Sequence, residues 1–153
     1  MSDAAMKSEA LELTMEREFS HPPEAVFKAW TDQQALRQWM GPGEVKCPGA
    51  EMDARVGGEL TIPMVHSDGN ITTARGEMRE YVQDRKLRFT WAWDHEDGSA
   101  GQLMEITLEF FPTESGTRLT LHQVNFVDTD ARDKHNGGWN GCCDKLEAYL
   151  AAS

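Results

Sequence analysis

Residues 135–150 read HNGGWNGCCDKLEAYL, and this stretch decides the fold of the chain. Its larger side chains recur at steps of four, four, three and four positions. An α-helix turns once every ~3.6 residues, so side chains at these steps share one face. The spacing predicts a helix over about residues 130–150 that buries one face, made of His135, Trp139, Cys143, Leu146 and Leu150.

The chain before this helix has the pattern of strands joined by short turns. Apolar and polar residues alternate in each run, and turn-forming pairs such as Gly57-Gly58 and Asp68-Gly69 separate the runs. Alternation with a period of two predicts half-buried strands, and short turns between them favour an antiparallel meander. The expected strands are residues 45–53, 59–65, 71–82, 86–93, 102–111 and 117–126.

The beginning of the chain predicts one more strand and two short helices. Residues 11–19 alternate, and the run ends at His21-Pro22-Pro23, where proline cannot extend a strand. Pro23 can open a first helix, and Thr31-Asp32 can cap a second one. We therefore expect an α+β fold in which a curved antiparallel sheet of six to seven strands grips the C-terminal helix. A space between sheet and helix would make a natural apolar pocket.

Length and composition set the class of protein. The 153 residues suit a single domain, 1–153, with residues 1–9 loosely ordered. The formal net charge of −11 argues against nucleic-acid partners and against docking on anionic membranes. Three cysteines, two of them adjacent, do not form a disulfide framework, and the start of the chain lacks a secretory signal. These features lead us to expect a cytoplasmic protein.

No motif identifies a catalytic centre or a cofactor. The chain has no Gly-x-Ser-x-Gly, no phosphate-binding loop and no dinucleotide-binding glycine pattern. His135, Cys142 and Cys143 could share a helix face, but a zinc site needs more ligands at closer spacing, so we expect packing thiols and no metal. We assign no catalytic residue and no cofactor.

The candidate ligand site follows from the faces that the strands and the last helix turn toward each other. Most of these side chains must pack as core, but tryptophan and histidine carry polar atoms that suit a cavity wall. We expect the ligand to contact Phe89, Trp91, Trp93, Met104 and Ile106 from the strands and His135, Trp139 and Cys143 from the helix.

Three further residues are candidate polar anchors for the ligand. Arg17 and Glu80 share the parity of apolar neighbours in their strands, and His95 continues the parity of Trp93. The alternative is that they lie at a wet rim where the alternation breaks. For His135 we expect a neutral imidazole hydrogen-bonded to the sheet or to water. If Gly137-Gly138 delays the helix, His135 belongs to a loop instead.

Several segments together resemble a known family. They are VFKAWTDQQALRQWMGP at 26–42, DARVGGE at 53–59, GEMRE at 76–80, RKLRFTW at 85–91, GTRLTLH at 116–122 and HNGGWNGCCDKLEAYL at 135–150. In this order they resemble the proteins similar to the activator of the heat-shock protein 90 ATPase. That family is part of the START-related helix-grip (SRPBCC) superfamily, which also holds polyketide cyclases and pollen-allergen-like proteins.

The resemblance covers roughly residues 10–151 and implies the helix-grip fold. Cys143 stands where the family usually has leucine, and Met40 stands where a second tryptophan is common. The co-chaperone's additional N-terminal domain has no counterpart in this sequence, which argues against a chaperone-activating role.

Three functions are open at this point. The first is binding of a small apolar or aromatic ligand in the cavity. The second is a cyclase- or hydratase-like enzyme, with His95, His135 or Glu80 as the acid or base. The third is a module that interacts with a chaperone, for which an exposed apolar patch would be needed.

Overall fold

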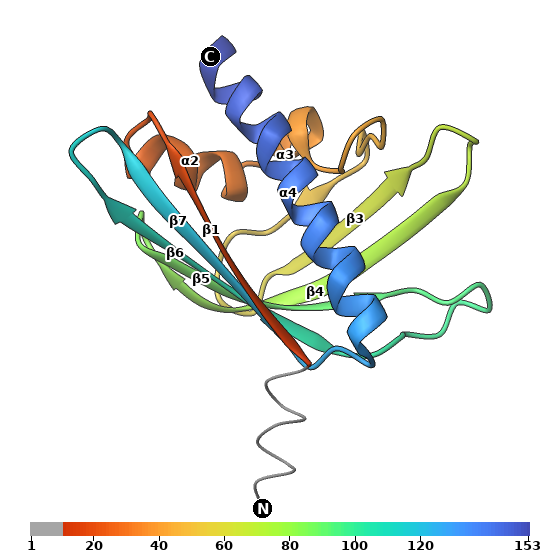
Figure 1. Cartoon of the computed structure of the whole chain (residues 1–153). Helices are drawn as coiled ribbons and strands as arrows, with labels where there is room; N and C mark the ends of the chain where they lie inside the picture. Colours follow the sequence, from red (N-terminus) through yellow and green to blue (C-terminus); the bar gives the residue numbers. More distant parts are fainter. Residues whose placement is uncertain (1–10) are drawn as a thin grey trace, which may run out of the picture.

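The computed structural model describes residues 11–153, and the expectation for residues 1–9 lies outside this range. Within this described range, seven strands and three helices follow one another (Figure 1). They are β1 (Glu12–Phe19), α2 (Pro23–Thr31), α3 (Gln33–Trp39), β2 (Glu51–Met52), β3 (Glu59–Val65), β4 (Ile71–Val82), β5 (Lys86–Trp93), β6 (Met104–Pro112), β7 (Thr117–Val124) and α4 (Thr129–Ala152).

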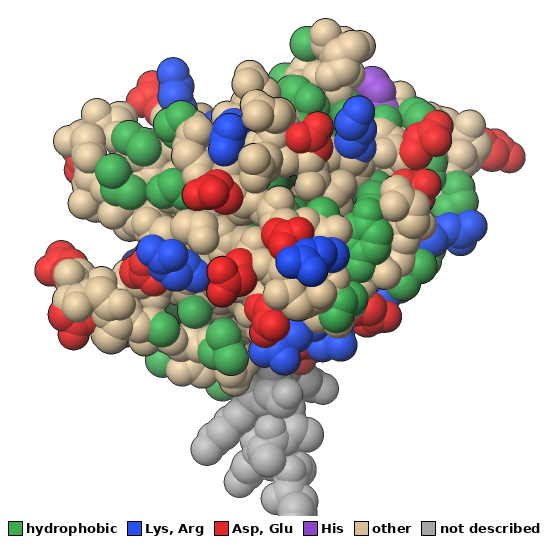
Figure 2. All heavy atoms as spheres, turned by 180° about the vertical axis from the view of Figure 1, so that it is seen from behind, with side chains coloured by type: hydrophobic (Ala, Val, Ile, Leu, Met, Phe, Trp, Pro, Cys, Tyr) green, Lys and Arg blue, Asp and Glu red, His purple; other side chains and the backbone are tan. Residues whose placement is uncertain are grey.

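The strands form one antiparallel sheet in the order β1-β7-β6-β5-β4-β3-β2. Helix α4 crosses one face of this sheet, and α2 and α3 lie near one end of it (Figure 1). Seen from behind, the molecule carries interspersed acidic and basic side chains (Figure 2). The helix-grip fold expected from the sequence is confirmed.

Local sequence explains where each helix begins. Pro23 opens α2, and the Asp32 side chain accepts a hydrogen bond from the Gln34 N–H at 2.9 Å to cap α3. Asp128 caps α4 in the same way, accepting from the Ala131 N–H at 2.8 Å. Helix α4 runs without a break through Gly137 and Gly138. His135 is therefore a helical residue.

The strand expected over residues 45–53 is the main departure from the sequence prediction. Only Glu51–Met52 forms a strand there, and Lys46 makes a single bridge to Val65. Pro48-Gly49 separates these two contacts, because proline has no N–H to give to a ladder. Strands β3, β4 and β5 have the expected bounds.

A β-bulge in β4 changes which residues face the core. Met78 lies opposite Phe89, whereas Tyr81 lies opposite Leu87, so three positions of β4 match two positions of β5. Met78 faces inward, and beyond the bulge Tyr81 packs edge-on against Phe27 in the core at a ring-centroid distance of 5.4 Å. The inward parity of β4 is therefore even before the bulge and odd after it.

Four indole rings fill the middle of the grip. Trp30 contacts Trp39 and Trp139 at ring-centroid distances of 4.7 and 6.0 Å, and Trp139 contacts Trp91 at 5.3 Å. All four side chains are almost fully buried. This aromatic cluster closes the space between sheet and helix on one side and leaves the cavity on the other.

Candidate functional site

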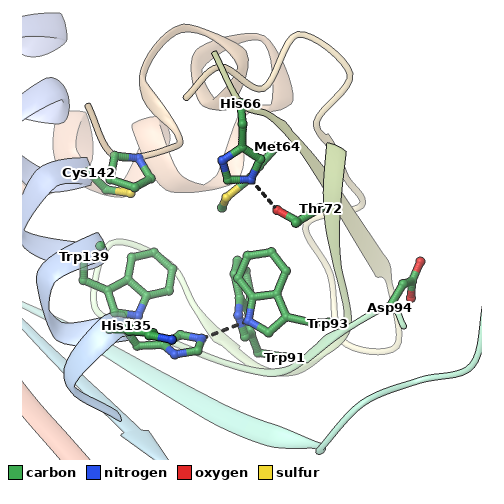
Figure 3. A pocket seen from close by; sticks show the side chains of 12 residues that line it. Met64, His66, Thr72, Trp91, Trp93, Asp94, His135, Trp139 and Cys142 are labelled. Atoms are coloured by element: carbon green, nitrogen blue, oxygen red, sulfur yellow. Dashed lines mark hydrogen bonds between the residues drawn. The ribbon is translucent and has the colours of Figure 1, made fainter. Parts of the chain in front are cut away.

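An apolar cavity of about 330 Å³ lies between α4 and the part of the sheet formed by β3, β4 and β5. Nearly all of its surface is carbon and sulfur. Figure 3 shows its side chains converging from the sheet, the helix and the loop after α3. They are Pro42, Met64, His66, Thr72, Trp91, Trp93, Asp94, Lys134, His135, Gly138, Trp139 and Cys142.

The β3–β4 hairpin supplies one wall. Met64 and Thr72 are direct cross-strand partners, so they share a face of the sheet. The His66 backbone N–H donates to Asn70 O at 2.8 Å and so closes the turn. Its imidazole Nε2 lies 2.9 Å from the Thr72 Oγ1 (Figure 3). The turn thus places a histidine–threonine pair at this end of an otherwise apolar cavity.

Strand β5 supplies the floor through Trp91 and Trp93. Ala74 lies opposite Trp93 across the strands, and this small residue leaves room for the indole. Trp93 packs edge-on against Trp91 at a ring-centroid distance of 5.7 Å. Asp94, at the end of the strand, is held by Arg75 in an ion pair of 2.8 Å.

Helix α4 supplies the opposite wall through residues spaced as one helical face. His135, Gly138, Trp139 and Cys142 lie on it, and Lys134 lies beside them. The Trp139 indole N–H donates to Gln123 Oε1 at 2.7 Å, so its polar atom is satisfied inside the protein. Gly138 contributes no side chain, and the nearest atom to a Cβ built there is Pro42 Cγ at 4.0 Å. The cavity owes part of its width to this glycine.

The His135 imidazole has both nitrogens hydrogen-bonded within the protein. The Trp93 indole N–H donates to Nε2 at 2.9 Å, and Nδ1 lies 2.8 Å from Ala131 O (Figure 3). An indole is only a donor, so Nε2 must be the unprotonated acceptor and Nδ1 must carry the proton. Burial lowers the pKa of His135 below its usual value, although the bond to Ala131 opposes this shift. The expectation of a neutral imidazole bonded to the sheet agrees with this geometry.

The three cysteines are free, buried thiols. Burial raises the pKa of Cys142 to about 12, and it raises those of Cys47 and Cys143 to about 11. Cys142 lines the cavity, but at neutral pH it is a thiol and a weak nucleophile. Within residues 11–153, no three His, Cys, Asp or Glu side chains gather to hold a metal ion.

The structure brings half of the sequence-predicted contact residues to the cavity. Trp91, Trp93, His135 and Trp139 line it. Four others lie in the packed core instead, because the aromatic cluster and the Trp139–Gln123 pair separate that region from the cavity. These four are Phe89, Met104, Ile106 and Cys143.

None of the three candidate polar anchors reaches the cavity. Arg17 reaches α4, where it binds Asp144 at 2.9 Å and Asn140 O at 3.2 Å. The bulge in β4 turns Glu80 outward to Arg88, whose guanidinium holds the pKa of Glu80 below its usual value.

His95 is displaced for a different reason. Strand β5 ends at Trp93, and His95 is the first residue of a tight turn. The alternation of the strand therefore does not extend to His95. Gly98 N–H bonds back to His95 O at 2.9 Å, and the His95 side chain is exposed. The apolar pattern of residues 89–95 therefore does not predict the direction of the His95 side chain.

Sequence reasoning missed the hairpin wall and part of the helix wall. Met64, His66 and Thr72 were not predicted, although they flank the turn predicted at Asp68-Gly69 and share one parity across it. On the helix, Cys142 and not Cys143 faces the cavity. Pro42, Asp94, Lys134 and Gly138 complete the lining.

Comparisons with known proteins agree with this architecture. The family model described as activator of Hsp90 ATPase homolog 1-like protein matches residues 20–151. The chain is similar to the solved structure of an AHSA1 protein from Silicibacter pomeroyi, with 30% identity and a TM-score of 0.85 over 92% of this chain and 98% of that chain.

Two further bacterial structures are also similar. A protein from Chromobacterium violaceum is 26% identical, with a TM-score of 0.81 over 92% of this chain and 97% of that chain. A protein from Nitrosomonas europaea is 25% identical, with a TM-score of 0.79 over 94% of this chain and 96% of that chain. No curated protein matches the chain significantly. With its helix-grip fold and a family match over most of its length, the chain belongs to the activator of Hsp90 ATPase homolog 1-like family.

Proposed function

We propose that this protein binds a small apolar molecule in the cavity between α4 and the β3–β4–β5 part of the sheet. The observation that carries the proposal is the lining itself, in which three indoles face a space of about 330 Å³. Ligand sites in proteins are concave and mainly apolar, and their volumes start near 300 Å³. Each 100 Å² of apolar surface that a ligand covers contributes about 2.5 kcal/mol before the costs of binding.

The alternative of a cyclase- or hydratase-like enzyme receives little support from the site. General acid–base catalysis needs a titratable group that is free to exchange a proton with the substrate. His135 has both nitrogens occupied, and His66 is paired with a threonine and not a carboxylate. Glu80 and His95 lie outside the cavity.

The alternative of a chaperone-binding module would need an apolar docking surface. The large apolar side chains exposed in the described part of the chain come from five different turns and strand ends. They are Val56, Ile71, Val82, Leu103 and Val127. Within residues 11–153, no helix is long and apolar enough to cross a membrane. The scatter of the five exposed side chains favours a small molecule as the partner.

Binding of a neutral fluorescent probe tests the proposal. 1-Naphthylamine, which has two rings, should shift its emission to shorter wavelength when it enters the cavity and should quench the tryptophans that line it. Gly138→Phe should abolish both effects, because its ring would occupy the cavity. Gly137→Phe is the matched control, since that position is exposed on the same helix and has no atom within 4 Å of an added Cβ. A well-folded Gly138→Phe protein that binds the probe as the parent does would contradict the proposal.

A further inference from the structure

We propose that the cavity selects a neutral aromatic molecule of about two rings that carries one hydroxyl group, with the hydroxyl bound by the His66–Thr72 pair. This inference rests on the proposed function and specifies the chemistry of its ligand. Three properties of the site carry it: the polar groups that remain available, the size of the space and the charges around it.

Most polar groups of the lining already have partners. The indole N–H groups of Trp93 and Trp139 donate to His135 and Gln123. Both nitrogens of His135 are used, and Asp94 is paired with Arg75. The two indoles and His135 gain nothing from a polar ligand unless an existing bond breaks, and the Asp94 carboxylate lies at the edge of the cavity, beyond Trp93 as seen from α4 (Figure 3).

The Trp91 indole N–H has no partner, but it is enclosed. Its nitrogen is buried beyond the reach of a water-sized molecule, and the residue as a whole is 1% exposed. The Lys134 ammonium lies on the exposed side of α4, within 3.3 Å of Asp130. The Trp91 indole nitrogen therefore cannot meet a ligand, and the Lys134 side chain, 78% exposed, keeps its remaining N–H groups in water.

The His66–Thr72 pair has spare hydrogen-bonding capacity in both arrangements of its proton. If the threonine hydroxyl donates to His66 Nε2, the oxygen keeps both acceptor sites. If Nε2 carries the proton and donates, the threonine keeps one acceptor site and its own O–H donor. The threonine oxygen can accept in either case. A ligand hydroxyl fits both arrangements, because it donates to this oxygen and can also accept.

The volume limits the size of the ligand. An apolar protein cavity of about 150 Å³ holds one benzene molecule. The cavity here is about 330 Å³, so about two aromatic rings fit. The aromatic cluster prevents a longer molecule from reaching deeper, because Trp139 and Trp91 pack directly against each other.

The charges around the cavity disfavour an anionic ligand. Moving a carboxylate into an apolar space without a paired cation is expensive. Lys134 of the lining is paired with Asp130, Arg75 is paired with Asp94 of the lining, and the chain as a whole carries a formal charge of −11. A neutral hydroxyl avoids this cost.

Calorimetric titration with four related compounds tests the inference. We expect 2-naphthol to bind about tenfold more tightly than naphthalene or 2-methoxynaphthalene, the usual effect of one hydrogen bond in a shielded site. We expect 2-naphthoate to bind most weakly. Equal affinities for 2-naphthol and naphthalene, or tightest binding of 2-naphthoate, would overturn the inference and leave the proposed function standing. If none of the four compounds binds and the naphthylamine probe does not bind either, the proposed function itself is refuted.

Substitutions at Thr72 locate the hydroxyl. Thr72→Val keeps the shape of the side chain and should remove the roughly tenfold preference for 2-naphthol, while naphthalene affinity is unchanged. Thr72→Ser should restore the preference. Thr73→Val is the matched control, because Thr73 has the opposite parity in β4 and should leave all four affinities as they are. A preference for 2-naphthol that persists in Thr72→Val would show that the hydroxyl binds elsewhere and would overturn the assignment.

Discussion

The Trp93 indole N–H donates a hydrogen bond of 2.9 Å to Nε2 of His135, joining β5 to α4 beside the cavity. The bond fixes the tautomer of the histidine, because the indole offers only a donor. It also restrains the first turns of α4, where Gly137 and Gly138 weaken the helix by about 1 kcal/mol each relative to alanine. The histidine therefore acts first as a structural link between helix and sheet.

Lowering the pH should reduce the free energy of unfolding, because His135 must take up a proton that its buried site disfavours. Its pKa is lowered in the folded state, whereas in the unfolded chain a histidine titrates near pH ~6.5. The unfolded state therefore binds more protons below about pH 6.5, and the free energy of unfolding should fall as the pH is lowered through this range. Denaturant titrations of the parent and of His135→Phe between pH 8 and pH 5 measure the effect.

Comparing the parent with His135→Phe separates the contribution of His135 to the pH dependence from that of the four other histidines. The difference in free energy of unfolding between the parent and His135→Phe should shrink toward low pH. Only the parent has a buried histidine whose protonation favours the unfolded state. A difference that stays constant over the whole range would contradict the assignment. The ¹⁵N shifts of the imidazole should show an unprotonated Nε2 at pH 7.

Breaking the His135–Trp93 bond should cost stability more than ligand affinity. His135→Phe can keep the ring contact with Phe126, which lies 5.1 Å away, but it leaves the Trp93 indole without an acceptor. An unpaired buried donor costs about 1–3 kcal/mol. Adding Trp93→Phe removes that donor, so the double variant should lose less stability than the sum of the two single variants. Additive losses would show that the two residues are not coupled.

Two glycines of α4 should respond in opposite ways to alanine. Gly137→Ala meets no atom within 4 Å and should stabilise the protein by up to about 1 kcal/mol through helix propensity. Gly141→Ala places a Cβ 2.9 Å from Pro42 Cβ and 3.3 Å from Pro42 Cα. The proline cannot swing away as a flexible side chain would, so this variant should be destabilised despite its better propensity. Thermal unfolding should show a higher melting temperature for Gly137→Ala and a lower one for Gly141→Ala. Equal stabilisation by both substitutions would contradict the close packing of Gly141 against Pro42.

The thiols should be unreactive in the native state. Burial keeps all three cysteines protonated at pH 8, since their pKa values lie at about 11 to 12. A disulfide reagent such as Ellman's should therefore modify none of them without denaturant and all three in it. Rapid modification of one thiol in the native protein would mean that its segment opens on the time scale of the assay. Cys142→Ser would then identify the cavity-lining residue as that thiol or exclude it.

The sequence predicted the order of elements well because each has a local signal. The alternation in β3, β4 and β5, the capping aspartates and the stripe from His135 to Leu150 are all readable from neighbouring residues. The site was harder, because it depends on which side chains leave space unfilled. Trp91 and Phe89 share one parity of one strand, yet only Trp91 reaches the cavity, since the packing of Trp139 decides the boundary. No pattern within a strand contains that information.

Glu80 shows a second way in which parity reasoning fails. Counting by twos from Gly76 placed it inward, but the bulge inserts one residue and resets the count. His66 and Thr72 show the reverse case. Their parity was available from the turn between them, but only the three-dimensional closeness of α4 makes their side of the hairpin part of a binding site.

The bulge in β4 also determines which side chains of this strand line the cavity, and with them the polarity of the cavity wall. Tyr81 is anchored against Phe27 on one side of the bulge, and Thr72 and Ala74 face the helix on the other. In a strand with the same residues and no bulge, alternation by twos from Tyr81 would turn Thr73 and Arg75 toward α4 instead. A single inserted residue thus separates a lining that accepts an aromatic molecule from one that would present a guanidinium group.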